Sequence, residues 1–240
     1  MTPLYYDLHL HSCLSPCGDE EMAPGNIAGM AALCGLQAVA LSDHNTCGNC
    51  APFLAAARAV GLIALPGMEL TTREEVHVLC LFPGLPEAEA FAAYVYARLP
   101  DIPNDEAVFG PQLFTGDGDA PQGREPRLLL SAADVGLYDT AALVRAHGGL
   151  AIPAHIDRPS FSLLANLGFY DPAMNFPVME LSHRADETAL RAAHPELEGV
   201  RFIRNSDAHR LEDIRDAQNA LHVGVPTAEG VLGALGLSKN

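Results

Sequence analysis

The feature that most constrains the fold is a recurring pattern in which a short apolar segment ends in a histidine or an acid. The first such segment is Asp7-Leu8-His9-Leu10-His11-Ser12, and others end at 42–45, 67–70, 76–78, 153–157 and 205–209. Side chains two apart on a strand point to the same face, so His9 and His11 should project together, away from Leu8 and Leu10. Neighbouring imidazoles form the start of a metal site. The pattern predicts strands that carry metal ligands at their ends.

Helical segments separate these expected strands. We expect strands at 4–10, 37–41, 62–66, 75–82, 150–153, 178–181, 200–203 and 221–225, and helices at 24–34, 52–60, 87–98, 139–145, 161–167, 185–193 and 227–236. Repeated strand–helix units imply an α/β fold with a parallel sheet and outer helices. Because the chemistry-bearing residues fall at the C-terminal ends of five or more strands, a closed barrel is favoured over an open doubly wound sheet.

The segment at about 83–138 interrupts this alternation. Within it, residues 100–127 are dense in Pro, Gly, Asp and Asn, with Gly116-Asp117-Gly118-Asp119 at the centre. We interpret the segment as an insertion, a lid or a subunit contact, within one domain spanning 1–240. Gly116–Asp119 lacks the spacing and terminal Glu of an EF-hand, which favours a solvated turn over a calcium site.

Charge and hydropathy restrict the partners. Lys and Arg total 14 and Asp and Glu total 30, which gives a net charge of −16 over 240 residues. Such an acidic chain is not expected to bind long nucleic acid, whereas bound metal ions would let it attract a small phosphorylated substrate. No apolar run approaches the ~20 residues of a membrane span, and no secretory signal is visible. We therefore expect a cytoplasmic protein without membrane contact, and the oligomeric state stays open.

The ordered set of motifs resembles the polymerase-and-histidinol-phosphatase (PHP) family of phosphoesterases. The matching pieces are Asp7-Leu8-His9-Leu10-His11-Ser12, Ser42-Asp43-His44-Asn45-Thr46, Gly67-Met68-Glu69-Leu70, Val76-His77-Val78, Ala154-His155 and Ser206-Asp207-Ala208-His209. The resemblance implies a distorted seven-stranded (β/α) barrel with up to three divalent ions. It also implies a metal-dependent phosphoesterase that hydrolyses a small phosphorylated metabolite, such as a nucleotide or histidinol phosphate, with metal-activated water.

The resemblance further implies which residues bind the ions. The sets are His9, His11, Glu69 and Asp207 for the first ion, Glu69, His77 and His155 for the second with Glu69 bridging, and Asp19, His44 and His209 for the third. The segment before Asp19 is longer than usual in the family, so Glu20 and Glu21 are alternatives for that ligand. Imidazole and carboxylate groups suit zinc, manganese or iron without any thiolate.

Candidate catalytic residues lie beside these ligands. Arg158 follows His155 and is the first candidate for a forked contact with phosphate; a surface ion pair is the alternative. Three sources of the proton for the leaving group stay open: His209 if it is not a ligand, His183, and metal-bound water. Arg184 and Arg210 are further candidates for phosphate contact.

Other polar residues have structural alternatives. Asp43 and Asp157 either orient an imidazole or are solvated turn acids. His147 is expected at a helix C-terminus, where a cation is favourable, and His194 and His222 are expected to be structural or exposed.

The cysteines divide into two groups. Cys34 and Cys80 fit apolar patterns and are expected in the core. The other four, in loops after the first two strands, are candidates for a small structural zinc site or a redox pair, or are idle: Cys13, Cys17, Cys47 and Cys50.

Two other functions stay open. A phosphodiesterase or exonuclease on short oligonucleotides would favour a basic, aromatic-lined groove, yet the chain has no Trp and no basic cluster. A non-catalytic, metal-binding regulatory module is the second alternative, against which the nearly complete ligand set argues.

Overall fold

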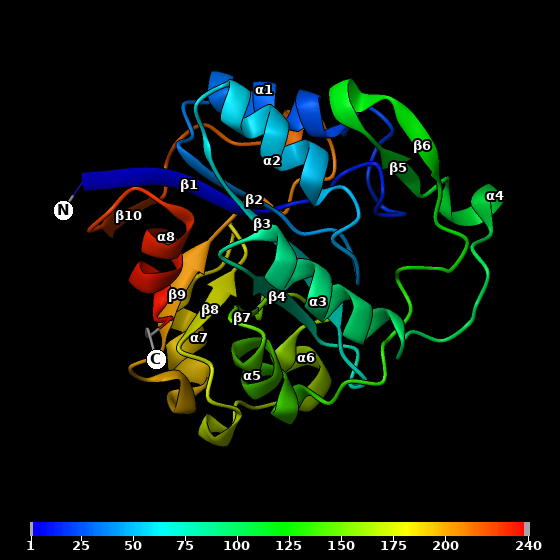
Figure 1. Ribbon diagram of the computed structural model, residues 1–240. Helices are drawn as coiled ribbons and strands as arrows, with labels where there is room; N and C mark the ends of the chain where they lie inside the picture. Colours follow the sequence, from blue (N-terminus) through cyan, green and yellow to red (C-terminus); the bar gives the residue numbers. More distant parts are fainter. Residues whose placement is uncertain (1, 238–240) are drawn as a thin grey trace.

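The computed structural model describes residues 2–237, so the two ends of the expected domain, residue 1 and residues 238–240, lie outside the described residues (Figure 1). Its main sheet has the order β10-β1-β2-β3-β4-β7. These strands are β1 (Thr2–Leu10), β2 (Ala38–Leu41), β3 (Ile63–Thr71), β4 (His77–Leu81), β7 (Leu150–Pro153) and β10 (Ala220–Val223). A parallel pair, β8 (Val178–Leu181) and β9 (Arg201–Arg204), and an antiparallel pair, β5 (Leu113–Thr115) and β6 (Pro121–Arg124), complete the strands.

The main sheet curls into a half-barrel, and two backbone hydrogen bonds link it to the β8–β9 pair. The amide of Ile156, after β7, donates to the carbonyl of Glu180 on β8 at 3.0 Å. The amide of His11, after β1, donates to the carbonyl of Ala208, after β9, also at 3.0 Å. Strands β1, β2, β3, β4, β7, β8 and β9 thus surround one interior, with β10 as an added edge. The prediction of a distorted seven-stranded α/β barrel is confirmed.

The expected parallel sheet is wrong at two strands: the edge strand β10 runs antiparallel to β1, and β4 is reversed within the barrel. This strand runs antiparallel to both β3 and β7. Residues 72–76 alone connect β3 to β4, and a parallel crossover needs about a dozen residues or more. His77 is therefore the first residue of β4, and it pairs with Thr71 at the end of β3. The reversal keeps His77 on the same rim as the C-terminal ends of the neighbouring strands.

Apolar side chains form two layers on either side of the strands. One layer takes residues from all seven barrel strands together with β10 and α8 (Ala228–Leu235). The other lies between the strands and the outer helices. Leu8 belongs to the first layer and Leu10 to the second, which coincides with a register shift between Asp7 and Leu10. The expectation that both leucines share a face is therefore wrong, because the strand is not regular at its end.

The outer helices lie within about two residues of their expected bounds. They are α1 (Pro24–Leu33), α2 (Cys50–Ala59), α3 (Leu85–Tyr96), α5 (Leu137–Ala146), α6 (Leu163–Leu167) and α7 (Glu187–Ala193). Figure 1 shows α1 and α2 together on one side of the sheet, with α5 and α6 on the opposite side. Pro24 opens α1, where its missing N–H costs no hydrogen bond. Gly168 ends α6 with φ +82°, a conformation that favours glycine.

The segment 83–138 contains the expected helix α3. It also contains the short helix α4 (Glu106–Phe109) and the β5–β6 hairpin, neither of which is predicted from the sequence. The hairpin and α4 project to one side in Figure 1. The amide of Leu113 donates to the carbonyl of Cys13 at 2.9 Å, and the Asn45 side chain donates to the carbonyl of Leu129 at 2.7 Å. The segment is thus attached to the loops that follow β1 and β2. Its role as a lid or subunit contact stays a prediction.

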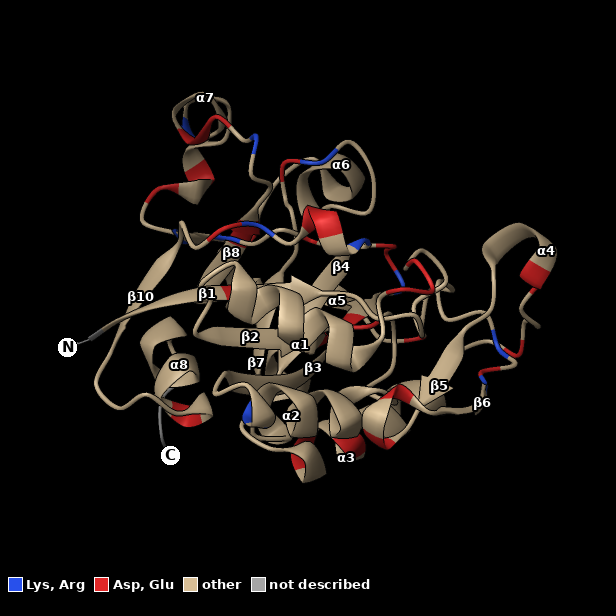
Figure 2. Cartoon of the chain, turned by 90° about the horizontal axis from the view of Figure 1, so that it is seen from above, with Lys and Arg blue, Asp and Glu red and all other residues tan. Residues whose placement is uncertain are grey.

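Charged residues are unevenly spread over the described residues. Figure 2 shows acidic positions on several of the outer helices, including α3 and α7, and basic positions on the loops near α6 and α7. Within residues 2–237, no helix combines the length and the apolar character that crossing a membrane requires.

Candidate metal centre

Glu69, on β3, lies among five imidazoles and is 1% exposed. Its Oε1 lies 3.0 Å from His77 Nδ1, 3.1 Å from His155 Nε2 and 3.4 Å from His9 Nε2. Its Oε2 lies 3.2 Å from His44 Nδ1 and 3.4 Å from His11 Nε2. These rings come from segments far apart in the sequence, and the curled sheet brings them to one rim. A buried carboxylate shared in this way can bridge two cations.

The residues expected for the first ion converge. Potential ligand atoms of His9, His11, Glu69 and Asp207 all lie within 4.8 Å of one another. The two Nε2 atoms of His9 and His11 are 3.1 Å apart, so the H-x-H pair projects together as predicted. Asp207 Oδ1 lies 3.1 Å from His9 Nε2 and 3.2 Å from His11 Nε2. The geometry brings this whole expected set together.

The other two groups differ in part from the expected sets. One consists of His44, Glu69 and His77, with His155 alongside at the Glu69 carboxylate. The other consists of His11, Cys17, His44 and His209. His44 therefore belongs to two groups, a sharing that sequence spacing does not show.

Asp19 is not in any of the ligand groups found among the described residues, and neither are Glu20 and Glu21. Asp19 is exposed, and its carboxylate accepts a hydrogen bond from the amide of Glu21 at 3.0 Å. Its own amide donates to the carbonyl of His209 at 2.9 Å. Cys17, and not Asp19, lies in the group with His44 and His209 among the described residues.

Glu180, on β8, orients His9, a role that the sequence analysis missed. His9 Nδ1 lies 3.0 Å from Glu180 Oε2, so that Nδ1 donates and Nε2 is left to face the cluster. Glu180 also accepts from the side chain of Asn205 at 3.0 Å and from the amide of His155 at 3.1 Å. The available signal was an acid within an apolar strand, which is fully buried here.

Asp43 orients His11 indirectly, through Ser15. His11 Nδ1 lies 3.0 Å from Ser15 Oγ, which donates to Asp43 Oδ1 at 2.7 Å. Asp43 is 1% exposed, so it is not a solvated turn acid. Asp157 instead accepts from the amide and hydroxyl of Ser182 at 2.7 and 2.5 Å, and so holds the loop after β8.

Three residues in or beside the site have a positive φ. His155 has φ +31°, Asp207 has φ +53° and Phe161 has φ +52°. Such conformations cost about 1–3 kcal/mol each for residues other than glycine, and they persist where surrounding contacts impose them. The hydrogen bond from the His155 amide to Glu180 is one such contact. These backbone conformations direct the His155 ring and the Asp207 carboxylate into the cluster.

Of the candidate arginines, Arg158 contacts the metal centre directly. Arg158 Nη1 lies 2.5 Å from Asp207 Oδ2, and the arginine side chain is 39% exposed. His183 is exposed, lies outside the ligand groups and accepts from Arg184 Nε at 3.2 Å. Arg210 is exposed and lies 4.0 Å from Glu212, in a surface ion pair. His209 stacks on His11 with ring centroids 4.3 Å apart and belongs to one of the candidate ligand groups.

The buried charges shift the pKa values of these groups in opposite directions. Burial alone would raise the pKa of Glu69, but His77, His9 and His44 hold it well below its usual range. Burial alone would lower the pKa of His11, but hydrogen bonds to Asp207 and Glu69 raise it to about 9. Burial lowers the pKa of His44 well below its usual range, and burial together with the charge of His11 lowers that of His209 to about 4. The ion-free cluster is thus partly protonated.

The donor set fits bound divalent ions. Among the described residues, the buried His44 Nδ1 and Asp207 Oδ1 lie 3.2 Å from Glu69 Oε2 and 3.1 Å from His9 Nε2, contacts too poorly aligned to satisfy them as hydrogen bonds. Buried polar atoms are nearly always satisfied, and imidazole and carboxylate groups directed at a common point suit cations of the zinc, manganese or iron type. The unpaired donors are therefore consistent with the expected metal centre.

The expected convergence of the four loop cysteines is not found. All six cysteines are free, and within residues 2–237 neither Cys13, Cys47 nor Cys50 joins a ligand group. The thiol of Cys13 faces the carbonyl of Leu113, and that of Cys50 faces the carbonyl of Gly67. Cys17 is exposed as a residue, but its sulfur lies against three histidines; burial, followed by the charges of Glu69 and Asp207, raises the pKa of its thiol.

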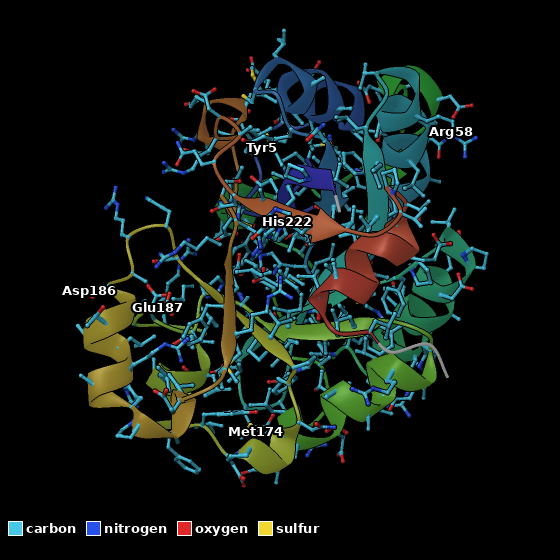
Figure 3. The ribbon with its side chains drawn as sticks, turned by 90° about the vertical axis from the view of Figure 1, so that its left-hand side faces the viewer. Tyr5, Arg58, Met174, Asp186, Glu187 and His222 are labelled. Carbon is cyan, nitrogen blue, oxygen red and sulfur yellow. The ribbon has the colours of Figure 1, made fainter. Side chains whose placement is uncertain are left out.

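The histidines outside the centre have structural positions, as predicted. His147 ends α5 and lies 2.8 Å from the carbonyl of Leu143. His194 lies 3.2 Å from Glu196, and His222 is exposed on the edge strand β10 (Figure 3).

The fold and site together define a class: a distorted α/β barrel that gathers histidines and carboxylates for several metal ions at one rim. The sequence profile of the PHP domain matches residues 7–147, more than half of the chain. The chain therefore belongs to the PHP family, as its motifs predict. Its buried His, Glu and Asp clusters are of the kind that a metal-dependent phosphoesterase uses.

Solved structures share this fold. The lesion-specific endonuclease Q of Pyrococcus furiosus is 21% identical with a TM-score of 0.72, and the match covers 98% of this chain and 56% of the endonuclease. A Bifidobacterium adolescentis protein assigned as a metal-dependent phosphoesterase is 17% identical (TM-score 0.61, covering 98% and 96%). An amidohydrolase from Chromobacterium violaceum is 21% identical (TM-score 0.60, covering 96% of each chain). This chain thus spans just over half the length of the endonuclease. No curated protein matches the chain.

Proposed function

We propose that this protein is a metal-dependent phosphomonoesterase that hydrolyses a small, soluble phosphorylated metabolite in the cytoplasm. The observation that carries the proposal is the position of Glu69, within 3.4 Å of five imidazoles and shared between two ligand groups. A buried carboxylate in this setting can hold two ions close together, the arrangement that metal-assisted phosphoryl transfer requires. Membership of the PHP family supports the same reaction class.

When bound, the ions would supply a nucleophile from water at neutral pH and would neutralise phosphate charge. The protein's own residues orient the reaction. Glu180 and Ser15 fix the rings of His9 and His11 so that their Nε2 atoms point inward. Arg158 is half-exposed beside Asp207, so its planar guanidinium can turn from that carboxylate to hold two phosphate oxygens.

His183 is proposed to contact the substrate rather than to supply the leaving-group proton. Partial burial and the charges of Arg215, Arg184 and Arg158 lower its pKa, so the ring is neutral at neutral pH. Its Nε2 accepts from Arg184, which leaves Nδ1–H to donate a hydrogen bond. With His209 assigned as a ligand, the proton for the leaving group comes from solvent at the centre. Direct hydrolysis without a phosphorylated protein residue follows from this arrangement.

Phe161 favours a substrate with a planar ring. Its side chain is 44% exposed and stacks on His77 with centroids 4.8 Å apart and planes at 19°. The backbone carbonyl of Phe161 accepts from the amide of His77 at 3.0 Å, which holds the ring beside a metal ligand. An exposed aromatic ring can stack on a base or imidazole. Nucleotides and histidinol phosphate both carry such a ring, and both are proposed as substrate types.

The proposal is tested by reconstituting the chelated protein with zinc, manganese or iron(II) and comparing p-nitrophenyl phosphate with its bis-ester. We expect hydrolysis of the monoester to depend on the metal and to exceed that of the bis-ester. Preference for the bis-ester would instead favour the phosphodiesterase alternative. Full metal loading without turnover of either ester or of a panel of phosphometabolites would favour a regulatory module.

Arg158→Ala should lower kcat/KM for the monoester by about 10²-fold, because a charged fork to phosphate is lost. Metal content should not change, since Arg158 is not a proposed ligand. Arg210→Ala is the matched control, because Arg210 is exposed and its nearest acid is a surface residue. Equal kinetics for both variants would remove Arg158 from the proposed site.

A further inference from the structure

The loop between β1 and α1 folds back over the metal centre by two successive turns. The amide of Ser15 donates to the carbonyl of Ser12 at 3.0 Å, and the amide of Gly18 donates to the carbonyl of Ser15 at 2.9 Å. A Cβ atom on Gly18 would lie 2.3 Å from the Ser12 carbonyl oxygen, so this close approach requires glycine. The turns return the chain to the rim at Cys17.

The sulfur of Cys17 and ring nitrogens of His11, His44 and His209 all lie within 4.8 Å of one another. Within residues 2–237 the Cys17 thiol makes no hydrogen bond to another residue, which is also true of Cys47, whereas the thiols of Cys13, Cys34 and Cys50 each face a backbone carbonyl. Nδ1 of His44, which is 3% exposed, lies 3.2 Å from Glu69 Oε2 but makes no well-aligned hydrogen bond with any described residue. The Cys17 thiol and this imidazole are therefore potential metal ligands that no described residue satisfies.

We propose that Cys17 is a protein ligand of a metal site formed with His44 and His209, in the place where the sequence predicts Asp19. His11 lies alongside, but its Nδ1 is bonded to Ser15 and its Nε2 belongs to the first ion. Two imidazoles and one thiolate form the donor set of a tetrahedral ion whose fourth position is open to an exogenous ligand. The thiol loses its proton when the metal binds, as coordinating thiols do. Asp19 acts on the loop instead, because its amide is bonded to His209 and its carboxylate to Glu21.

A thiolate changes which ion this site prefers. Manganese and magnesium favour oxygen ligands, whereas zinc, cobalt and iron(II) accept sulfur. The site should therefore retain zinc or cobalt in competition with manganese, whereas the sites around Glu69 offer imidazole and carboxylate groups. This inference rests on the metal centre assumed in the proposed function but not on phosphate hydrolysis, so the two can fail separately.

The test is cobalt(II) titration of the chelated, reduced protein, followed by its absorption spectrum. Wild type should show a sulfur-to-cobalt charge-transfer band in the near ultraviolet, and Cys17→Ser should lose that band together with about one ion per chain. Asp19→Asn should keep both. In the zinc-loaded protein, X-ray absorption should detect a sulfur ligand at about 2.3 Å, absent in Cys17→Ser.

Cys34→Ser is the matched control, because Cys34 is half-buried at the C-cap of α1 and lies outside the ligand groups. It should keep the band and the full metal content. Circular dichroism of each variant confirms that the fold is retained. Loss of an ion in Asp19→Asn with an unchanged spectrum in Cys17→Ser would overturn the inference. A thiolate band in a protein without phosphatase activity would support the inference and contradict the proposed function.

Discussion

At the scale of the residue, each histidine of the centre has two ring nitrogens with different neighbours. His9 and His11 use Nδ1 for an outer hydrogen bond, to Glu180 and to Ser15, and direct Nε2 inward. His77 directs Nδ1 at Glu69, and His155 directs Nε2 at the same carboxylate. The outer partner therefore decides which tautomer is present and which nitrogen can bind a metal.

Glu180→Gln should weaken metal affinity by about 10- to 100-fold, because the ring of His9 loses its charged acceptor while the shape of the side chain is kept. The measurement is competition for zinc against a chelating dye. Glu187→Gln is the control, since Glu187 lies in the first turn of α7, beyond the centre (Figure 3). Unchanged zinc affinity in Glu180→Gln would show that His9 does not need this partner.

Metal binding should become tighter as pH rises towards about 9. In the ion-free protein the pKa of His11 is raised to about 9, so this ring keeps its proton at neutral pH. The protonated ring stabilises the ion-free fold, and that contribution is lost as pH rises through 9. A ligand must be neutral, so binding below pH 9 displaces the proton. Affinity should rise by up to about tenfold per pH unit for each proton displaced.

Calorimetry at one pH in two buffers of different ionisation enthalpy counts the protons released on zinc binding. A binding heat that is the same in both buffers, with an affinity that does not change between pH 7 and 8, would contradict the assignment of a protonated His11.

At the scale of the element, helix α1 depends on a residue from the segment 83–138. Its N-cap residue, Ala23, supplies no side-chain hydrogen bond. The side chain of Asp119 supplies the acceptor instead, because the amide of Gly25 donates hydrogen bonds to its two carboxylate oxygens at 2.9 and 3.2 Å. A carboxylate at a helix N-terminus is also favoured by the helix dipole. The excursion that contains β5 and β6 is thereby joined to the helix that follows the metal-binding loop.

Asp119→Ala should lower the free energy of unfolding by about 1 kcal/mol, the usual cost of removing a helix cap. It should also speed proteolysis within 100–127, since the hairpin loses its attachment to α1. Asp117→Ala is the control, because Asp117 is exposed in the same turn and makes no hydrogen bond in the described part of the chain. Urea unfolding measures the free energy of unfolding of both variants. Equal values for Asp119→Ala and Asp117→Ala would show that the cap does not stabilise the fold.

At the scale of the whole molecule, a net charge of −16 opposes long polyanions, whereas the metal centre attracts a single phosphate group. The structural match to an endonuclease therefore does not by itself imply the same substrate. We expect no binding of a duplex DNA of about 27 base pairs by fluorescence anisotropy at about 0.15 M salt, where exposed charges are screened beyond about 8 Å. Binding at nanomolar protein concentrations would contradict the proposed small substrate.

The sequence by itself determined much of the fold and the site. Alternating apolar segments placed nearly every strand and helix, and prolines and glycines marked helix ends such as Pro24 and Gly168. The histidines and acids at strand ends identified the family and most of the metal-binding residues. These features are local, or depend on the order of motifs along the chain, so they can be read without contacts.

The tertiary structure decided what depends on contacts between distant segments. The orientation of His9 by Glu180 and the capping of α1 by Asp119 each join residues far apart in sequence. The reversal of β4, by contrast, follows from the short connection formed by residues 72–76. The tertiary structure also decided between Cys17 and Asp19, which lie two residues apart on one loop. The resemblance to the family favours the acid, but the sulfur of Cys17 lies with three histidine rings, whereas Asp19 donates its amide to His209 and its carboxylate accepts from Glu21.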